Sequence, residues 1–445
     1  MLIVENLAAQ PDASVPQASG DWATTKATYR FWDNSQVQPE DIIAAHEQRT
    51  SARLKQHSVI LAIQDTTGLS FNHHPSKTVE QGFGPISSHQ YSLGLKVHSV
   101  LAASSDGVPL GVLEQQTWAR EPKKKKGKAN RHRNRPLAHK ESRRWLAGLV
   151  NTELSVPNGC RVVSVADAEA DIYELFALER AENSELLIRA AQNRCVEHPS
   201  RYLQEAIAQC APAGQTNVEV RAKEGQVERT AQLTIRFGQF NLLPPSNRPK
   251  STPLQPVKIT VIWAHEHHPP EGCTSISWLL LTTLSVTTLE DALCCVRWYS
   301  YRWLIERFHF VLKSGCHIEQ LQLESASRIM RALATYTIVA WRLLWLTYEA
   351  RVNPQQSCEI ALEGYEWQAL FCHTHQCTQP PSTPPSLHQA IRWIAQLGGF
   401  LGRKGDGEPG VKTIWRGLRR LHDIASTWKL MCSQPSSGEG LPTCG

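Results

Sequence analysis

Four polar side chains recur at helical spacing in the stretch "WYSYRWLIERFHFVLKSG": Tyr299, Arg302, Glu306 and Lys313. At about 100° per residue, this spacing places all four within a sector of about 60° on one face of one helix. A carboxylate binds a divalent metal ion, and Arg forms bidentate hydrogen bonds with phosphate. Lys adds a point charge, and Tyr supplies a hydroxyl or a stacking ring. The stripe therefore predicts a site for a phosphodiester held beside a metal ion.

Two further acids follow apolar runs that read as buried strands. "HSVILAIQDTT" places Asp65 at or near the end of one strand, and "GCRVVSVADAEAD" places Asp167 at the end of another. Asp171 in the same segment could be the ligand or could cap the following helix, and we favour Asp167 because it lies nearer the strand end. Taken alone, an Asp at a strand end is more often a turn former or a helix cap.

Together with Glu306, these two acids make a set of three carboxylates. Such a set holds two divalent ions about 4 Å apart, one of which activates a water or hydroxyl while the other stabilises the leaving oxygen. No protein nucleophile is needed. Two His and Cys clusters are weaker metal candidates, because "FCHTHQC" is tighter than usual zinc spacing and "AHEHHPP" is more simply read as exposed His.

The order of predicted elements indicates the fold. Three strands, a helix and then alternating strands and helices are typical of an RNase H-like mixed sheet. We therefore predict an α/β protein with an RNase H-like catalytic core, an all-β insertion and flanking helical domains. The predicted segments are a helical domain at 1–55, the first part of the core at 56–194, the β-rich insertion at 195–288, the last core helices at 289–351, a Pro-rich linker at 352–385 and a C-terminal helical domain at 386–445.

The basic charge of the chain is local. The net charge is +6, but residues 123–135 hold eight Lys or Arg and no acid, so the remainder sums to −2. The run begins with Lys123, Lys124, Lys125 and Lys126. Such a run is often a solvated loop, but beside a phosphate-handling site it becomes a clamp on the nucleic-acid backbone whose binding weakens with salt.

Composition points to a soluble protein in a reducing compartment. Hydrophobic residues make up 41% of the chain, and its twelve Cys show no framework spacing. The most apolar window, "IMRALATYTIVAWRLLWLTYEA", carries Arg331 and Arg342, so it reads as a buried amphipathic helix rather than a membrane span. We expect a cytoplasmic, nucleoid-associated protein with no membrane partner.

These motifs resemble a known family. "LAIQDTTGLS", "VADAEADIYE" and the Y-R-E-K stripe are similar to the bacterial cut-and-paste DDE transposases of the insertion-sequence-four group, as are "SWLLLTT" and "IAQLGGFLGRKGDGEPGVKTIWRGLRRLHD". The resemblance covers nearly the whole chain. It implies that Asp65, Asp167 and Glu306 are a catalytic triad that binds two Mg²⁺ ions, with Mn²⁺ able to substitute.

The resemblance also implies DNA contacts. Tyr299, Arg302 and Lys313 would contact phosphates near the transposon end, and Trp278 would stack on a base flipped out of the duplex. Arg189 and Arg194 would contact the DNA backbone. From the residues alone, Trp278 is more simply a buried strand aromatic, and the two Arg side chains are equally well surface cations.

The activity implied is metal-dependent cleavage at transposon ends and strand transfer into target DNA. It would proceed through a hairpin intermediate, in a homodimer whose subunits each cut the end bound by the other. Two departures stand out: Ala168 replaces the usual Arg, and the helical DNA-binding segment at 1–55 is shorter than expected, which predicts N-terminal truncation. The alternatives are a non-catalytic DNA-binding remnant and an RNase H-like nuclease without strand transfer.

Overall fold

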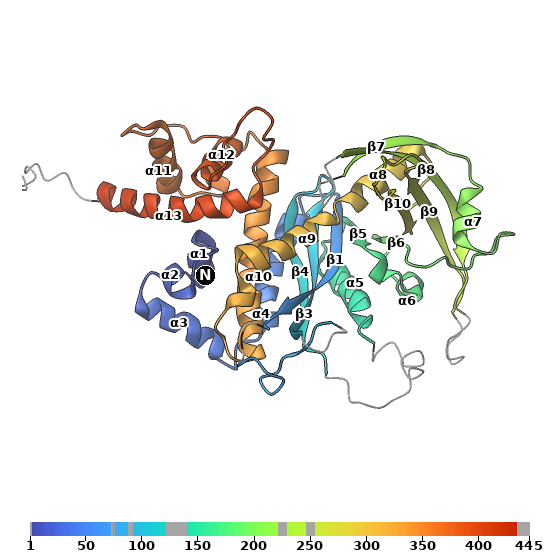
Figure 1. Ribbon diagram of the computed structural model, residues 1–445, viewed down its shortest axis with the longest axis horizontal. Coiled ribbons are helices and arrows are strands. Elements are labelled where there is room, and N and C mark those ends of the chain that lie inside the picture. The colour runs from blue at the N-terminus through green and yellow to red at the C-terminus, as the bar shows by residue number, and fades with distance from the viewer. Residues whose placement is uncertain are drawn as a thin grey trace, which may run out of the picture. The chain divides into compact units, whose positions relative to one another are not determined.

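The computed structural model describes residues 2–72, 74, 76–87, 92–121, 140–220, 229–245 and 254–433 (Figure 1). The chain forms two compact units: Ile43–Glu306 is one, and Met1–Ile42 together with Arg307–Gly445 is the other. Lys123, Lys124, Lys125 and Lys126 lie outside the described residues. Their predicted role as a clamp on DNA therefore stays a prediction.

Ten strands of the described residues form one sheet in the unit Ile43–Glu306. Its spatial order is β2-β3-β1-β5-β6-β10-β9-β8-β7, and β4 also pairs with β3. The bounds are β1 Val59–Ser70, β2 Gly84–Pro85, β3 Leu93–Ser104, β4 Pro109–Trp118, β5 Arg161–Ala166, β6 Ser184–Arg189, β7 Gly214–Val220, β8 Arg229–Leu242, β9 Val257–His265 and β10 Ser277–Thr282.

The strands β4, β3, β1, β5 and β6 are the mixed core that the sequence predicts. β1 pairs with β3 in antiparallel and with β5 in parallel orientation, and β5 pairs with β6 in parallel. Ile60, Leu61 and Ile63 of β1 are fully buried, as expected for a central strand. Helix α5 (Arg143–Ser155) packs against β4, β3 and β1, while α8 (Leu289–Ser300) contacts β5 and β6. The predicted RNase H-like α/β class is confirmed.

The predicted β-rich insertion continues this same sheet. β10 pairs with β6, and β9, β8 and β7 follow it, all in antiparallel orientation. The short helix α6 (Tyr173–Ala177) lies between the core strands β5 and β6 in the sequence, and α7 (Leu203–Ala208) lies between β6 and the insertion strand β7. The backbone groups of β6 that would form an edge are therefore satisfied by β10, and the core and the insertion share one hydrogen-bonded ladder.

The second unit is helical. Its elements are α1 (Leu2–Ala9), α2 (Val15–Ser19), α3 (Trp22–Asp33), α10 (Ala326–Val352), α11 (Gly364–His375), α12 (Leu387–Leu397) and α13 (Val411–Ser433). Helix α10 contacts α1, α3, α12 and α13. The N-terminal segment is tied to α10 by polar bonds: Trp32 Nε1 donates to Thr335 Oγ1 at 3.2 Å, and Arg331 Nε donates to the Val37 carbonyl at 2.8 Å.

Helix α10 is the only helix among the described residues that has the length and apolar composition of a membrane span. In its most apolar window, 72% of the residues are buried inside the protein. A core helix of a globular protein passes the same test, so this feature is weak evidence for a membrane span.

The segment predicted as a Pro-rich linker, 352–385, is partly helical, which corrects that prediction. It holds a 3₁₀ turn at Cys358–Ile360 and the helix α11. A capping box between Glu363 and Glu366 starts α11, and Trp367 and Leu370 bury its inner face. The prolines that suggested a linker follow this helix, so composition averaged over the segment concealed it.

Gly398 after α12 and Gly417 of α13 allow the two helices to pack in backbone contact. A Cβ on Gly417 of α13 would lie 1.7 Å from the Ile394 carbonyl oxygen of α12, whereas a Cβ on Gly410 meets nothing within 4 Å. We expect Gly417→Ala to lower the free energy of unfolding by about 3 kcal/mol, since the two helices must separate to admit the methyl group. Urea unfolding should show this loss and leave Gly410→Ala within about 0.5 kcal/mol of the wild type. A Gly417→Ala variant with the same free energy of unfolding as the wild type would contradict the close packing of α12 against α13.

Candidate active site

Asp65 and Asp167 lie side by side at the point where two parallel strands stop pairing. The last paired residues of β1 and β5 are Gln64 and Ala166, and the two acids follow them directly. Neighbouring strands are about 4.8 Å apart, and aligned residues of a parallel pair share a face. Both acids are half-buried. The structure thus places them together as the sequence predicts.

The strand that carries Asp65 does not end there, which corrects the predicted boundary. β1 continues to Ser70, because β3 pairs with it along its whole length and opposes Asp65 with Ser99. Asp167 does end its strand: its carboxylate accepts a 2.9 Å hydrogen bond from the Glu169 N–H and caps the 3₁₀ turn Ala168–Ala170. Ala168, where the resemblance expects Arg, begins this turn.

Glu306 is near enough to act electrostatically on Asp65. Burial raises the pKa of Asp65 to about 6, the Thr66 backbone N–H lowers it, the charge of Asp167 raises it, and Arg302 and Glu306 then lower and raise it respectively. Glu306 itself pairs with Arg302 at 2.6 Å. Arg302 is therefore in contact with Glu306 and also acts on Asp65.

In the part of the chain that the structure describes, no group of three or more His, Cys, Asp or Glu side chains is arranged as a ligand set for a metal ion. The three predicted acids are neighbours whose carboxylates do not surround a common point. Glu306 is turned to Arg302, and Asp167 is turned to the Glu169 N–H. The assignment of Asp65, Asp167 and Glu306 as metal ligands stays a prediction.

The polar stripe does not lie on one regular helix, which corrects the first prediction. Helix α8 ends at Ser300, α9 spans Trp303–Phe310, and a π-helical turn follows at Val311–Gly315. Between α8 and α9, backbone N–H groups donate to the carbonyl three residues earlier, as Leu304 does to Tyr301. This is the 3₁₀ pattern, which winds the backbone more tightly than an α-helix does. The π turn, which carries half-buried Lys313, then changes the angular phase, so a constant 100° per residue does not describe the stripe.

Tyr299, on α8, packs its ring against Trp278 of β10. The two ring centroids are 5.3 Å apart with an edge-to-face angle of 68°, and Tyr299 is only 3% exposed. Burial raises the pKa of the Tyr299 phenol, whereas Arg302 and a hydrogen bond with Arg189 lower it. Arg189 is exposed and Trp278 is half-buried, so they offer surface to a ligand where Tyr299 does not.

The structure gives Arg194 a different place from the predicted one. It is 8% exposed, and its guanidinium donates to Asp171 Oδ1 at 2.6 Å and to the Asp171 carbonyl at 2.6 Å. Asp171 also accepts bonds from the Ala191 and Gln192 N–H groups. A buried Arg engaged in this way does not contact DNA, and a carboxylate satisfied in this way is no free metal ligand. Asp167 is therefore the better candidate of the two acids.

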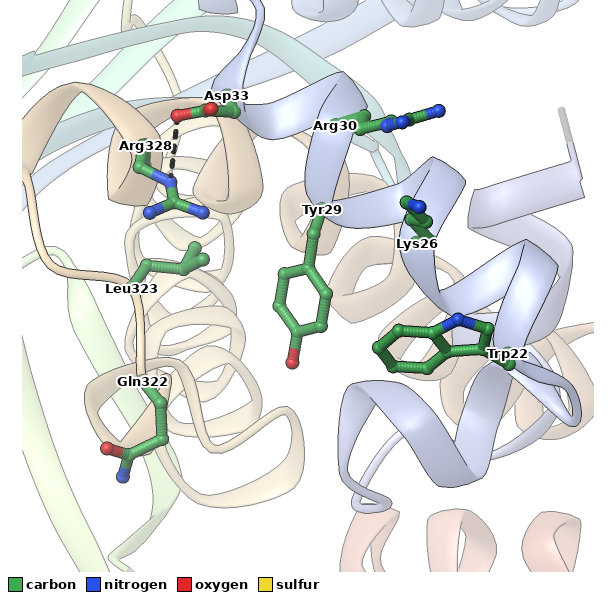
Figure 2. A pocket seen from close by; sticks show the side chains of 8 residues that line it. All are labelled: Trp22, Lys26, Tyr29, Arg30, Asp33, Gln322, Leu323 and Arg328. Carbon is green, nitrogen blue, oxygen red and sulfur yellow. Dashed lines mark ion pairs between the residues drawn. The ribbon is translucent and has the colours of Figure 1, made fainter.

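A basic and aromatic stripe on α3 escaped the sequence analysis. It lines a cavity of about 470 Å³ within the helical unit, together with the first turn of α10 and the segment before it (Figure 2). The lining residues are Trp22, Lys26, Tyr29, Arg30, Asp33, Gln322, Leu323 and Arg328. Trp22 is 76% exposed, and Lys26 and Arg30 are also exposed. The signal was present as helical spacing of basic and aromatic residues in "DWATTKATYRFWD".

Two segments match known protein families. Residues 1–37 match the family described as transposase DNA-binding, and residues 338–433 match the family described as the transposase Tn5 dimerisation domain. The first includes the α3 stripe, and the second runs from within α10 to the end of α13. These matches support a DNA-binding, dimerising enzyme of the Tn5 transposase type.

Proposed function

We propose that this chain, with the DNA-binding and dimerisation domains of a Tn5-type transposase at its two ends, is a cut-and-paste DDE transposase of the insertion-sequence-four group. It cleaves DNA at transposon ends and transfers the freed 3′-hydroxyl into target DNA of the bacterial nucleoid. One observation carries the proposal: Asp65 and Asp167 follow the last paired residues of two parallel strands, and the charge of Glu306 reaches Asp65.

The chemistry of these donors fits hard divalent cations such as Mg²⁺. Carboxylate oxygens are the ligands that Mg²⁺ and Mn²⁺ prefer. Burial is the main cause of the raised pKa of Asp65, and the charges of Asp167 and Glu306 raise it further. Asp65, Asp167 and Glu306 would hold two such ions. When bound, they would supply Lewis-acid activation of the attacking water or 3′-hydroxyl and of the leaving oxygen.

Arg302 has two tasks in this proposal. It holds Glu306 at 2.6 Å, so it fixes the position of this carboxylate. A guanidinium carries five N–H donors, and it can keep one bond to Glu306 while others donate to a phosphate oxygen. Lys313 adds a second cation for the phosphates near the transposon end.

Tyr299 serves through its neighbours. Its hydrogen bond with Arg189 orients an exposed guanidinium toward the DNA backbone, and its ring supports Trp278 from one edge. With one edge packed, the half-buried indole keeps a fixed orientation in which it can stack on a base flipped out of the duplex. Such a distortion is what a hairpin intermediate at the transposon end requires.

The partners follow from the same assignment. The chain dimerises when two transposon ends are brought together, and each subunit cuts the end held by the other. The domain match at residues 338–433 supports the dimer, and the match at residues 1–37 supports recognition of the end.

The test is cleavage of a duplex that carries the inverted repeat flanking the coding region. With Mg²⁺, the wild type should nick and release the end, and without a divalent ion it should only bind. Glu306→Gln should lower the cleavage rate by a factor of about 10³ or more while DNA binding stays intact, since it removes one anionic ligand of the metal site. Cleavage that persists in Glu306→Gln would overturn the triad, and binding without cleavage by the wild type would identify a non-catalytic DNA-binding protein.

The α3 stripe is expected to contact phosphates. Lys26→Ala should weaken DNA binding to a similar degree for all sequences and reduce the slope of log affinity against log salt by about 1, because one counterion fewer is released. Filter binding at several salt concentrations measures this slope. Lys258→Ala removes an exposed cation from β9 and serves as the control. Equal slopes for Lys26→Ala and the wild type would exclude the contact.

A further inference from the structure

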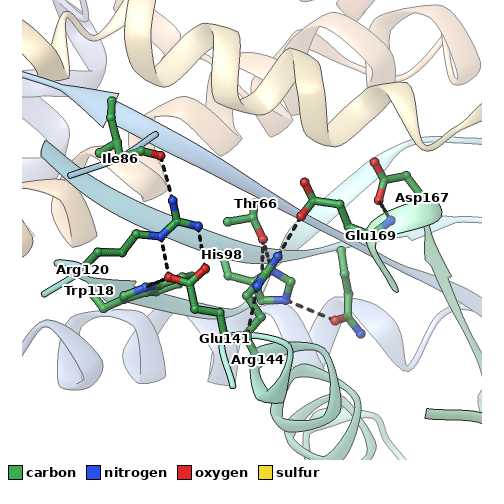
Figure 3. A network of polar contacts seen from close by, with 10 residues as sticks. Thr66, Ile86, His98, Trp118, Arg120, Glu141, Arg144, Asp167 and Glu169 are labelled. Carbon is green, nitrogen blue, oxygen red and sulfur yellow. Dashed lines mark hydrogen bonds and ion pairs between the residues drawn. The ribbon is translucent and has the colours of Figure 1, made fainter. Parts of the chain in front are cut away.

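Arg144 of α5 joins the two chain segments that carry the strand acids (Figure 3). Its Nε donates to Thr66 Oγ1 at 2.7 Å, and one terminal nitrogen donates to Glu169 Oε2 at 2.8 Å. The other terminal nitrogen donates to the Glu141 carbonyl at 3.0 Å. The Arg144 side chain is 11% exposed, whereas that of Glu169 is 61% exposed.

Two of the three partners of Arg144, Thr66 and Glu169, lie within two residues of an acid of the proposed triad. Thr66 follows Asp65 directly, and successive side chains of a strand alternate between faces, so Arg144 contacts Thr66 on the face opposite to that of Asp65. Glu169 lies two residues after Asp167, and its own backbone N–H donates to the Asp167 carboxylate. A displacement of Thr66 therefore moves Asp65, and a displacement of Glu169 moves Asp167.

The backbone does not provide this link. The parallel pairing of β1 with β5 ends at Gln64 and Ala166, one residue before the two acids. Asp65 and Asp167 repel each other when both are charged, and burial strengthens this repulsion. Arg144 crosses the gap just beyond the last paired residues.

Helix α5 gives Arg144 a fixed base. Trp145 is 1% exposed, and its ring meets the His98 ring at 4.7 Å. His98 also bonds to Thr66 Oγ1 at 2.9 Å through Nδ1. The helix approaches β1 so closely that a Cβ on Gly148 would lie 2.6 Å from Gln64 Oε1. The Arg144 backbone is therefore held by packing against the strands that it serves.

We propose that Arg144 is a positioning residue, which fixes the segments that carry Asp65 and Asp167 relative to each other so that both carboxylates can bind one divalent cation. This inference rests on the proposed function. Partners that orient metal ligands commonly change metal affinity or activity by 10 to 100-fold when they are replaced.

The test is Mn²⁺ binding by the full chain without DNA, followed by electron paramagnetic resonance of the free ion. Arg144→Gln and Glu169→Gln should each raise the dissociation constant about 10-fold, and the double variant should raise it no further, because both break one link. Glu169 is 61% exposed at its side chain, so Glu169→Gln threatens folding little. Arg143→Gln, at the exposed neighbour on the same helix, should bind Mn²⁺ as the wild type does.

The two substitutions separate positioning from simple electrostatics. Arg144→Gln removes a positive charge and Glu169→Gln removes a negative charge, so a purely electrostatic role would tighten Mn²⁺ binding in the first and weaken it in the second. Weakening in both supports positioning. Tighter or unchanged binding by Arg144→Gln, or additive losses in the double variant, would overturn it.

The failure of this inference and of the proposed function are distinguishable. A wild type that binds Mn²⁺ but cuts no DNA overturns the transposase activity, while weaker binding in both variants still supports the positioning role. A wild type that binds no Mn²⁺ overturns the metal site and the role of Arg144 together.

Discussion

Asp171→Asn is expected to lower the free energy of unfolding by about 3–5 kcal/mol, because it leaves the buried Arg194 cation without its counter-ion. The Asp171 side chain is fully buried and that of Arg194 is 7% exposed. Asp167→Asn, four residues earlier, should change stability by less than about 1 kcal/mol, since Asn caps a helical turn as well as Asp does. It should nevertheless abolish Mg²⁺-dependent cleavage.

Urea unfolding without divalent ions measures the stability of the two variants, and the cleavage assay measures their activity. Replacing both members of the pair, with Asp171→Leu and Arg194→Met, should recover part of the lost stability, because no unpaired charge remains buried. Unchanged stability in Asp171→Asn would show that the ion pair does not hold this loop. Cleavage retained by Asp167→Asn would exclude Asp167 as the metal ligand.

His46→Gln is expected to remove an acid sensitivity from the sheet unit. Burial lowers the pKa of His46 to about 3, with smaller contributions from Arg53 and Arg49, and its Nε2 accepts a 3.1 Å bond from the Val112 N–H. The folded pKa lies below the ordinary value, so the unfolded chain binds the proton first. Stability therefore falls as pH drops below about 6.5, by about 2 kcal/mol at pH 5 for this residue.

Urea unfolding at pH 7.5 and pH 5.0 measures this loss. Gln keeps an acceptor for Val112 but does not titrate, so the difference between the two pH values should shrink by about 2 kcal/mol in His46→Gln. His267→Gln, at an exposed His, is the control. An undiminished pH difference in His46→Gln would show that other groups cause the acid sensitivity.

The sequence predicted those parts of the site that depend on strand topology. Asp65 and Asp167 were predicted to share one metal site because each follows an apolar run that reads as a buried strand. The structure pairs these two strands in parallel, which brings the acids together. The prediction that Tyr299 and Lys313 share one helical face with Glu306 was wrong in detail. Side-chain spacing contains no sign of the tight turn before α9 or of the π turn after it, since both depend on packing.

The prediction for Arg194 failed for the same reason, because its position depends on a tertiary contact. A basic residue after a strand reads as exposed unless its partner is known, and that partner, Asp171, lies more than twenty residues earlier in the sequence. The bridge made by Arg144 was equally hidden, since Thr66 and Glu169 are far from it along the chain. The positions of Arg194, Asp171 and Arg144 therefore depend on tertiary contacts that the sequence pattern does not show.

The single continuous sheet sets the geometry of any DNA bound to it. The strand with Asp65 and the strand with Trp278 are separated by β5 and β6. Three strand spacings correspond to a lateral distance of about 14 Å, which backbone hydrogen bonds hold fixed. If Trp278 stacks on the displaced base, the order of the strands determines how many nucleotides separate that base from the cut phosphate. Side-chain substitutions at Trp278 should change how well the end is cut, but the position of the cut should not move.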